Sequence, residues 1–174
     1  MTDESGVPAP RPTGSLETTP SGLRLVLTRT FGASAHDVWT SVAEPDGLGR
    51  WIGTWEGDPA SGHVLFVMTA EGATEGEECR ILRCEPPRRL AVETFVGEAA
   101  WRLEIELAEV AGVTTMTFRQ ALGPADDASG IGPGWEYYLD RLVAARAGRD
   151  PAEVEWDRYY PALATHYGAA DETA

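Results

Sequence analysis

The chain has 174 residues, 43% of them hydrophobic with six tryptophans, and its 28 acidic residues outnumber 14 basic ones to give a formal charge of -14. This length fits one domain with a sizeable core, and the acidic balance argues against nucleic acid and anionic membranes as partners, because both are bound through positive patches. Every basic residue is an arginine, so the absence of lysine excludes Schiff-base chemistry and a phosphate-loop lysine.

The two ends of the sequence differ in composition from its middle. Residues 1–21 contain four prolines among small polar side chains, which predicts a disordered leader. Residues 168–174 predict a short flexible tail, and residues 22–167 are expected to form a single domain. The first residues lack the basic and apolar regions of a signal peptide, and no apolar run approaches the ~20 residues that span a bilayer. We therefore expect a soluble, cytoplasmic protein.

The first predicted elements are a strand and two short helices. Residues 23–31 alternate leucines with other side chains, which predicts a strand. Ser34 with an acidic residue three positions later, Asp37, is typical of a helix N-cap and predicts a helix over residues 35–43. A proline then opens a second short helical segment over residues 45–51.

Six further strand-like segments follow, separated by Gly-rich and Pro-rich turns short enough for hairpins. Their predicted ranges are 54–57, 63–69, 77–84, 89–96, 100–110 and 114–121. Residues 101–107 alternate perfectly, so we expect the face of Trp101 to be covered and the face of Glu104 and Glu106 to be wet. Two carboxylates on one face could do acid–base chemistry, but a solvated face is the favoured interpretation.

The C-terminal part of the sequence predicts a long one-sided helix. A turn at residues 130–134 places Pro133 in the first turn of this helix. Its apolar side chains recur at helical spacing, and they are Trp135, Tyr138, Leu139, Leu142 and Val143. Such a stripe needs a sheet to cover it. Residues 151–167 predict a further helical segment, broken near Pro161.

This order of elements predicts the α+β class, with helices on one side of an antiparallel sheet. Three motifs narrow the class: Phe31-Gly32-Ala33-Ser34-Ala35 leading into Asp37-Val38-Trp39, then Arg50-Trp51, then Gly134-Trp135 with Leu139 and Leu142. On these residues the chain, over about 22–148, resembles the START/Bet-v helix-grip superfamily (SRPBCC), and within it the domain named for the activator of the heat-shock-protein ATPase. The resemblance implies a curved antiparallel sheet wrapped around a long C-terminal helix, and it specifies fold better than activity.

Residues that could carry chemistry are scattered. His36, His63 and His166 fall on three separate elements, so we expect no metal, and nothing predicts another cofactor. Cys79 and Cys84 lie five residues apart on one predicted strand, which predicts opposite faces and two free, buried thiols. No catalytic residues are assigned, because no nucleophile motif occurs and the glycines at 130–134 fit a helix entry better than a phosphate loop.

Large apolar side chains are the one enriched feature with a functional meaning. The helix-grip resemblance implies that they face inward, between sheet and helix, where members of the superfamily commonly enclose a cavity. Ligand pockets are mostly apolar and aromatic, although the same rings could simply fill the core. The candidate ligand-binding residues are Trp51, Trp55, Phe66, Met68, Phe95, Trp101, Phe118, Trp135 and Tyr138.

Three functions compete at this point. The leading hypothesis is a module that binds an apolar small molecule in a cavity between the sheet and the C-terminal helix. The family name implies a co-chaperone that acts on a heat-shock ATPase, and this chaperone partner is the second hypothesis. The third is a cyclase-like or hydratase-like enzyme that uses an acid or His63 at the cavity mouth. Both a monomer and a homodimer fit the sequence.

Overall fold

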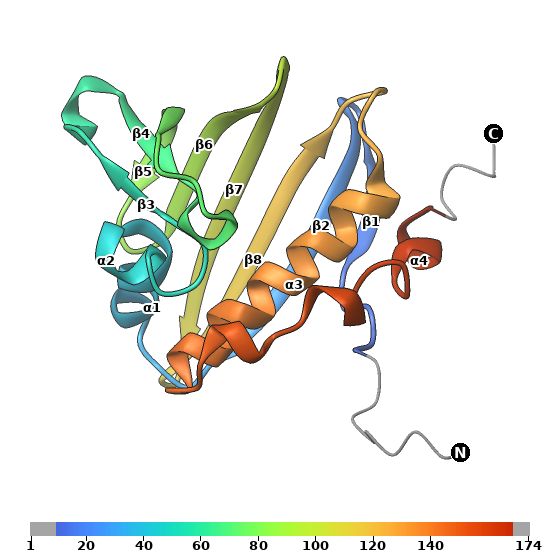
Figure 1. Cartoon of the computed structure of the whole chain (residues 1–174). Helices are drawn as coiled ribbons and strands as arrows, with labels where there is room; N and C mark the ends of the chain where they lie inside the picture. Colours follow the sequence, from blue (N-terminus) through green and yellow to red (C-terminus); the bar gives the residue numbers. More distant parts are fainter. Residues whose placement is uncertain (1–9, 169–174) are drawn as a thin grey trace.

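The computed structural model describes residues 10–168, and residues 1–9 and 169–174 of the predicted leader and tail lie outside the described residues. Within the described range, eight strands form one antiparallel sheet in the order β1-β2-β8-β7-β6-β5-β4-β3. The long helix α3 (Ala128–Arg146) crosses one face of this curved sheet (Figure 1). The predicted α+β class with a helix-grip arrangement is therefore confirmed.

The strands lie close to their predicted ranges. Their bounds are β2 Gly22–Phe31, β3 Thr54–Glu56, β4 His63–Val67, β5 Glu77–Glu85, β6 Arg89–Val96, β7 Ala99–Val110 and β8 Val113–Leu122. Strand β8 pairs with β2 along its length, so the end of the meander closes onto its beginning. The face of β7 that carries Glu104 and Glu106 is solvent-exposed, as expected. Their side chains are 45% and 36% exposed and form ion pairs with Arg119.

An additional strand, β1 (Ser15–Thr19), pairs with β2 at the edge of the sheet. The disordered leader predicted for residues 1–21 is therefore wrong for this segment. Its five residues include one large apolar side chain, Leu16, which packs against the core. So short a stretch has no strand signal of its own, and the backbone pairing with β2 stabilises it.

The helices lie on one side of the sheet. Their bounds are α1 Ala35–Ala43, α2 Pro45–Leu48, α3 Ala128–Arg146 and α4 Ala164–Gly168, with single 3-10 turns η1 Pro59–Ser61, η2 Thr69–Glu71, η3 Pro151–Glu153 and η4 Trp156–Arg158. The predicted cap of α1 is present, because the Ser34 side chain accepts a hydrogen bond from Asp37 N at 3.2 Å. Within residues 10–168, no helix is both long and apolar enough to cross a membrane.

Helix α3 begins earlier than predicted. Asp127 caps it by accepting a hydrogen bond from Ser129 N at 3.0 Å, so Pro133 lies inside the helix and the predicted turn at residues 130–134 is wrong. Glycine and proline disfavour helix, but Gly132 is the site where the ring of Tyr167 packs directly onto α3. This tertiary contact offsets the weak local propensity.

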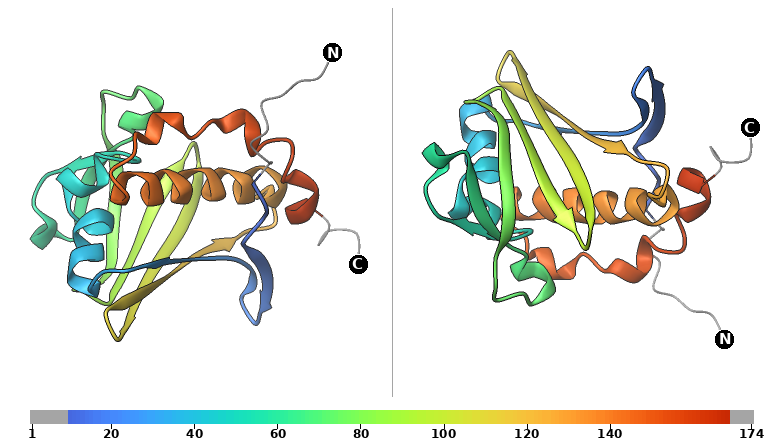
Figure 2. Two further views of the ribbon diagram at one scale, coloured as in Figure 1. Left: turned by 90° about the horizontal axis from the view of Figure 1, so that it is seen from below. Right: turned by 90° about the horizontal axis from the view of Figure 1, so that it is seen from above.

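The inner face of the sheet is well covered where α3 crosses β2 and β8. Leu25 and Leu27 of β2 and Met116 and Phe118 of β8 are between 0% and 2% exposed. Leu142 of α3 is 0% exposed and anchors the helix on the same core. Both views in Figure 2 show the long helix on a single face, with the C-terminal segment running back beside it.

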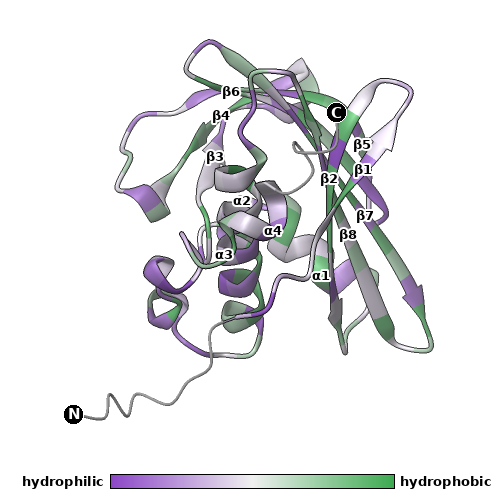
Figure 3. Cartoon of the chain, turned by 90° about the vertical axis from the view of Figure 1, so that its right-hand side faces the viewer, coloured by the Kyte–Doolittle hydropathy of each residue, from purple (hydrophilic) through white to green (hydrophobic). Residues whose placement is uncertain are grey.

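The same face is less well covered on β6 and β7. The strand register places Leu90, Val92, Leu103 and Ile105 on the inner side, and each is only half-buried. We call these four residues the open inner face. Green and purple segments alternate along the strands in Figure 3, as expected for a sheet with one apolar side.

Strand β5 contains an irregularity that corrects the prediction for the cysteines. Its register against β6 shifts between Ile81 and Arg83, which inserts one extra residue. As a result Cys79 and Cys84 both fall on the inner side of the register instead of on opposite faces. Cys79 is buried, but Cys84 is exposed, so the prediction of two buried thiols is wrong.

The two ends of the described chain meet at Glu136 of α3, which is 1% exposed. The backbone N–H groups of Thr13 and Gly14 donate to its carboxylate at 2.6 and 3.0 Å, the Tyr167 hydroxyl donates to it, and Arg29 pairs with it at 3.0 Å. Burial opposes ionisation, but the hydrogen bonds from Tyr167, Thr13 and Gly14 outweigh it and hold the pKa of Glu136 below its ordinary value. We call these five residues the Glu136 cluster.

Candidate functional site

Three predicted ligand-binding side chains meet where α3 crosses the sheet. The ring centroids of Phe118 and Trp135 lie 4.3 Å apart, and those of Trp135 and Tyr138 lie 6.2 Å apart. Phe118 is buried, whereas Trp135 and Tyr138 are half-buried because they flank the side of α3 that faces the core. The structure thus places aromatic rings at the border between the covered and the open parts of the inner face.

Three more predicted residues lie on the β3–β4 side of the molecule. Trp55 pairs with Phe66 across the two strands, Met68 follows directly after β4, and all three are half-buried against the core. The Tyr138 hydroxyl donates to Glu71 at 2.7 Å, which ties the segment after β4 to α3. Burial, followed by this hydrogen bond, raises the pKa of Tyr138, so the hydroxyl remains a donor at neutral pH.

The other three predicted residues lie elsewhere. Trp51 is buried at 3% exposure, and its indole N–H donates to the backbone oxygen of Ser41 at 2.8 Å, which connects α1 to the segment after α2. The register places Trp101 on the inner face of β7, near the β6–β7 turn, where it is half-buried. Leu107, on the same face of β7, is buried, so the burial of this face decreases from Leu107 towards Trp101.

Phe95 corrects the prediction that all nine side chains face inward. The register places it on the outer face of β6, where the Arg80 guanidinium lies 5.4 Å from its ring centroid. Both faces of β6 carry apolar side chains, so alternation along this strand could not tell the inner side from the outer side.

Gln120 is a residue that the sequence analysis missed. It lies on the inner side of β8, is 0% exposed, and its Oε1 accepts a hydrogen bond from the Trp135 indole N–H at 2.6 Å. Its amide nitrogen Nε2 is buried with no hydrogen-bond partner. A signal was available in the sequence, because an amide occurs there at the same period-two spacing as Met116 and Phe118.

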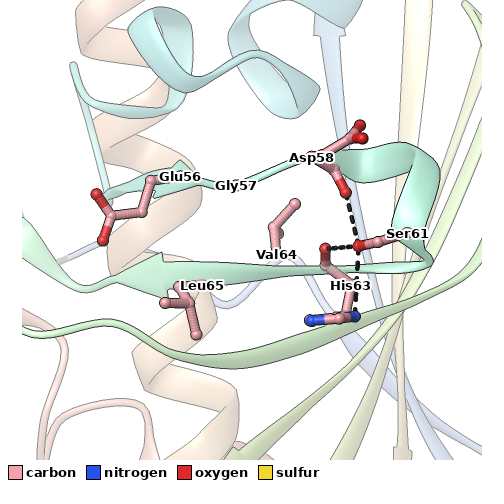
Figure 4. A pocket seen from close by; sticks show the side chains of 7 residues that line it. All are labelled: Glu56, Gly57, Asp58, Ser61, His63, Val64 and Leu65. Atoms are coloured by element: carbon pink, nitrogen blue, oxygen red, sulfur yellow. Dashed lines mark hydrogen bonds between the residues drawn. The ribbon is translucent and has the colours of Figure 1, made fainter.

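Two hollows at the surface lie away from the open inner face. The larger, ≈ 400 Å³, is formed by the β3–β4 hairpin and is lined by Glu56, Gly57, Asp58, Ser61, His63, Val64 and Leu65 (Figure 4). The smaller, ≈ 220 Å³, lies between α1, α2 and the end of α3 and includes Trp51, Arg50 and Arg146. Neither includes any of the other eight predicted ligand-binding residues.

The larger hollow holds the histidine that the enzyme hypothesis used. His63 pairs with Arg80 on the outer side of the sheet and is exposed, so it does not lie at the mouth of the space between sheet and helix. The neighbouring Ser61 hydroxyl bonds the backbone oxygens of Asp58 and His63 at 2.7 and 3.0 Å, which is a turn contact. Within residues 10–168, no group of three or more His, Cys, Asp and Glu side chains could hold a metal ion.

Comparisons with known proteins agree with this geometry. The model of the family described as "Activator of Hsp90 ATPase homolog 1-like protein" matches residues 32–147. A search of curated proteins gave no significant match.

Solved structures share the fold over most of the chain. The crystal structure of CalU16 from Micromonospora echinospora is 26% identical, with a TM-score of 0.73 over 92% of this chain and 96% of that chain. A conserved protein of unknown function from Enterococcus faecalis, EF2215, is 18% identical, with a TM-score of 0.67 over 88% of this chain and 87% of that chain. A Bordetella parapertussis protein encoded by gene BPP1335 is 25% identical, with a TM-score of 0.59 over 79% of this chain and 85% of that chain.

Proposed function

The chain belongs to the family of activator of Hsp90 ATPase homolog 1-like proteins, and within that family we propose that it binds an apolar small molecule on its open inner face, beside α3. The observation that supports the proposal is the contrast between the two halves of one sheet face. Central inner residues of β2 and β8, such as Leu27 and Phe118, are almost fully covered. By contrast, the four residues of the open inner face keep part of their apolar surface in contact with solvent.

Such a surface favours an apolar ligand. Each Å² of apolar surface removed from water contributes roughly 25 cal/mol, so a ligand that covers the exposed parts of the four side chains gains free energy from their burial. The half-buried rings of Trp135 and Tyr138 adjoin this surface and add aromatic contacts. Charged groups lie on the other side of β6 and β7, where Glu93 pairs with Arg102 at 3.0 Å.

A neutral fluorescent probe, N-phenyl-1-naphthylamine, tests the proposal directly. We expect saturable binding to the purified protein, with a rise in melting temperature that follows the logarithm of probe concentration. Leu103→Asp places a charge on the open inner face and should weaken binding by about tenfold or more, because the charge would lose water on binding. Phe95→Ala removes an apolar ring from the outer face and should leave binding unchanged.

Two results would contradict the proposal. One is that both substitutions weaken probe binding equally while both variants keep the native circular dichroism spectrum. This result would mean that the probe does not bind on the open inner face. The other is the absence of saturable binding together with faster ATP hydrolysis by a purified heat-shock ATPase in the presence of the chain. The co-chaperone alternative would then take the place of ligand binding.

A further inference from the structure

The buried amide of Gln120 has one satisfied end and one unsatisfied end. An indole N–H can only donate, so the bond from Trp135 at 2.6 Å requires the amide oxygen to face the indole. The amide orientation is thereby determined, and Nε2 points away from Trp135 with two hydrogens to donate and no acceptor in reach. Nearly all buried polar groups in proteins have a partner, so this donor is an exception that calls for an explanation.

The position of Gln120 connects this donor to the open inner face. In the sheet register Gln120 lies opposite Leu25 on one side and Leu103 on the other. Leu25 is 0% exposed, but Leu103 is half-buried and belongs to the open inner face. Trp135, which lies over the amide, is also half-buried. A ligand on the open inner face would therefore reach the amide by displacing Leu103 or Trp135.

Resting on the proposed function, we infer that the ligand is an uncharged apolar molecule with a hydrogen-bond acceptor, of the ketone or quinone class, whose oxygen accepts a hydrogen bond from Gln120 Nε2. The two cross-strand neighbours of Gln120 are leucines, and its same-face neighbours on β8 are Phe118 and Leu122. A carboxylate placed among these side chains would lose its hydration without gaining a cation, whereas a carbonyl loses far less. The neutral acceptor is thus the chemistry that fits the site.

Two pairs of probes that differ in a carbonyl group test the inference: 9-fluorenone against fluorene, and benzophenone against diphenylmethane. Calorimetry gives the dissociation constant of each probe. For each pair, the dissociation constant of the hydrocarbon is divided by that of the ketone, and this ratio is compared between proteins. Comparing this ratio between protein variants cancels the different solubilities of the probes in water. The two variants are Trp135→Phe, which keeps Gln120, and the double variant Trp135→Phe with Gln120→Leu, which removes both hydrogen-bonding partners.

We expect the ratio to favour the ketone in the wild type and in Trp135→Phe, and to fall by about tenfold in the double variant, as for the loss of one hydrogen bond. The hydrocarbons should bind both variants alike. If the double variant fails to fold, Gln120→Met in the wild-type background replaces it and should lower the ratio similarly. An unchanged ratio would overturn the role of Gln120 and leave the proposed function intact. Absence of binding by all four probes, in a protein that remains folded, would overturn both.

Discussion

The Glu136 cluster is the densest set of polar contacts on α3. It lies on the side of the helix that the apolar spacing of the sequence predicts to pack against the sheet. Glu136 is one residue beyond Trp135 and three before Leu139, within the buried side of the helix. A buried carboxylate is tolerated only when donors surround it, and here two backbone amides, two hydroxyls and a guanidinium do so. The same carboxylate connects the N-terminal segment, β2, α3 and α4.

The substitution Glu136→Gln tests this residue. The lowered pKa means that the folded state favours the ionised form, so this stabilisation is present above pH ~4.5 and is lost as the pH falls through the lowered pKa. We expect the variant to lose about 3 kcal/mol of unfolding free energy at pH 7, because Arg29 loses a charged partner, and the gap to the wild type should narrow in acid. Urea melts at several pH values measure the loss of stability at pH 7 and its dependence on pH. Glu104→Gln on the wet face should change stability by less than ~0.5 kcal/mol, and a gap that is independent of pH would contradict the role of ionisation.

At the scale of elements, the bulge in β5 places the two cysteines on the same face of the sheet, although they differ in burial. Regular alternation would separate residues five apart onto opposite faces, but the extra residue between Ile81 and Arg83 changes that relation. It also leaves Leu82 51% exposed. Burial raises the pKa of the Cys79 thiol to about 11, so this thiol is protonated at neutral pH, whereas Cys84 lies in solvent.

Thiol labelling checks the different exposure of the two cysteines. Treatment of the folded protein with iodoacetamide at pH 8 should modify Cys84 within minutes and leave Cys79 unmodified, because thiolate is the reactive form and access is required. Mass spectrometry of tryptic peptides separates the two sites, since Arg80 and Arg83 lie between them. In urea both thiols should react, which provides the control. Equal rates in the folded protein would contradict the burial of Cys79 and the exposure of Cys84 on β5.

At the scale of the whole molecule, the C-terminal segment is joined to α3 through a close approach at Gly132. A Cβ at this position would overlap the ring of Tyr167, whereas a Cβ at Gly134, two residues on, meets no atom within 4 Å. Both glycines are helical, so they share the same backbone preference and differ only in what lies beside them. This difference gives a matched pair of substitutions.

We expect Gly134→Ala to raise stability by roughly 0.5–1 kcal/mol, because alanine favours helix over glycine. Gly132→Ala should lower it by about 2 kcal/mol, because the methyl group forces α4 and Tyr167 away from the helix. Thermal unfolding of the two variants gives the sign of each effect. Hydrogen exchange in residues 164–168 should also accelerate in Gly132→Ala alone. Stabilisation by both substitutions would mean that the C-terminal segment is not held against α3.

Much of the fold could be predicted from local patterns. The alternation of β2 and β7, the Ser34 cap of α1 and the short turns between strands depend on neighbours in sequence, so they identified the elements and the α+β class. The apolar stripe of α3 likewise predicted a helix that lies on a sheet, and Leu139 and Leu142 are buried as expected. Seven of the nine candidate residues belong to the apolar core or pack against it, because the helix-grip arrangement brings their elements together, but their role in ligand binding stays a prediction.

The remaining features depend on partners that are distant in the sequence, and only the tertiary structure decided them. Strand β1 exists because β2 offers it backbone hydrogen bonds, and Tyr167 packs on α3 at Gly132, where a side chain would leave no room. The unequal cover of the inner face depends on where α3 crosses the sheet, which no single segment encodes. The unpaired nitrogen of Gln120 follows from that crossing, since Trp135 takes the amide oxygen and no side chain from β2 or β7 reaches the other end. Periodicity specifies which face a side chain occupies, but the contacts made across that face are set by packing between elements.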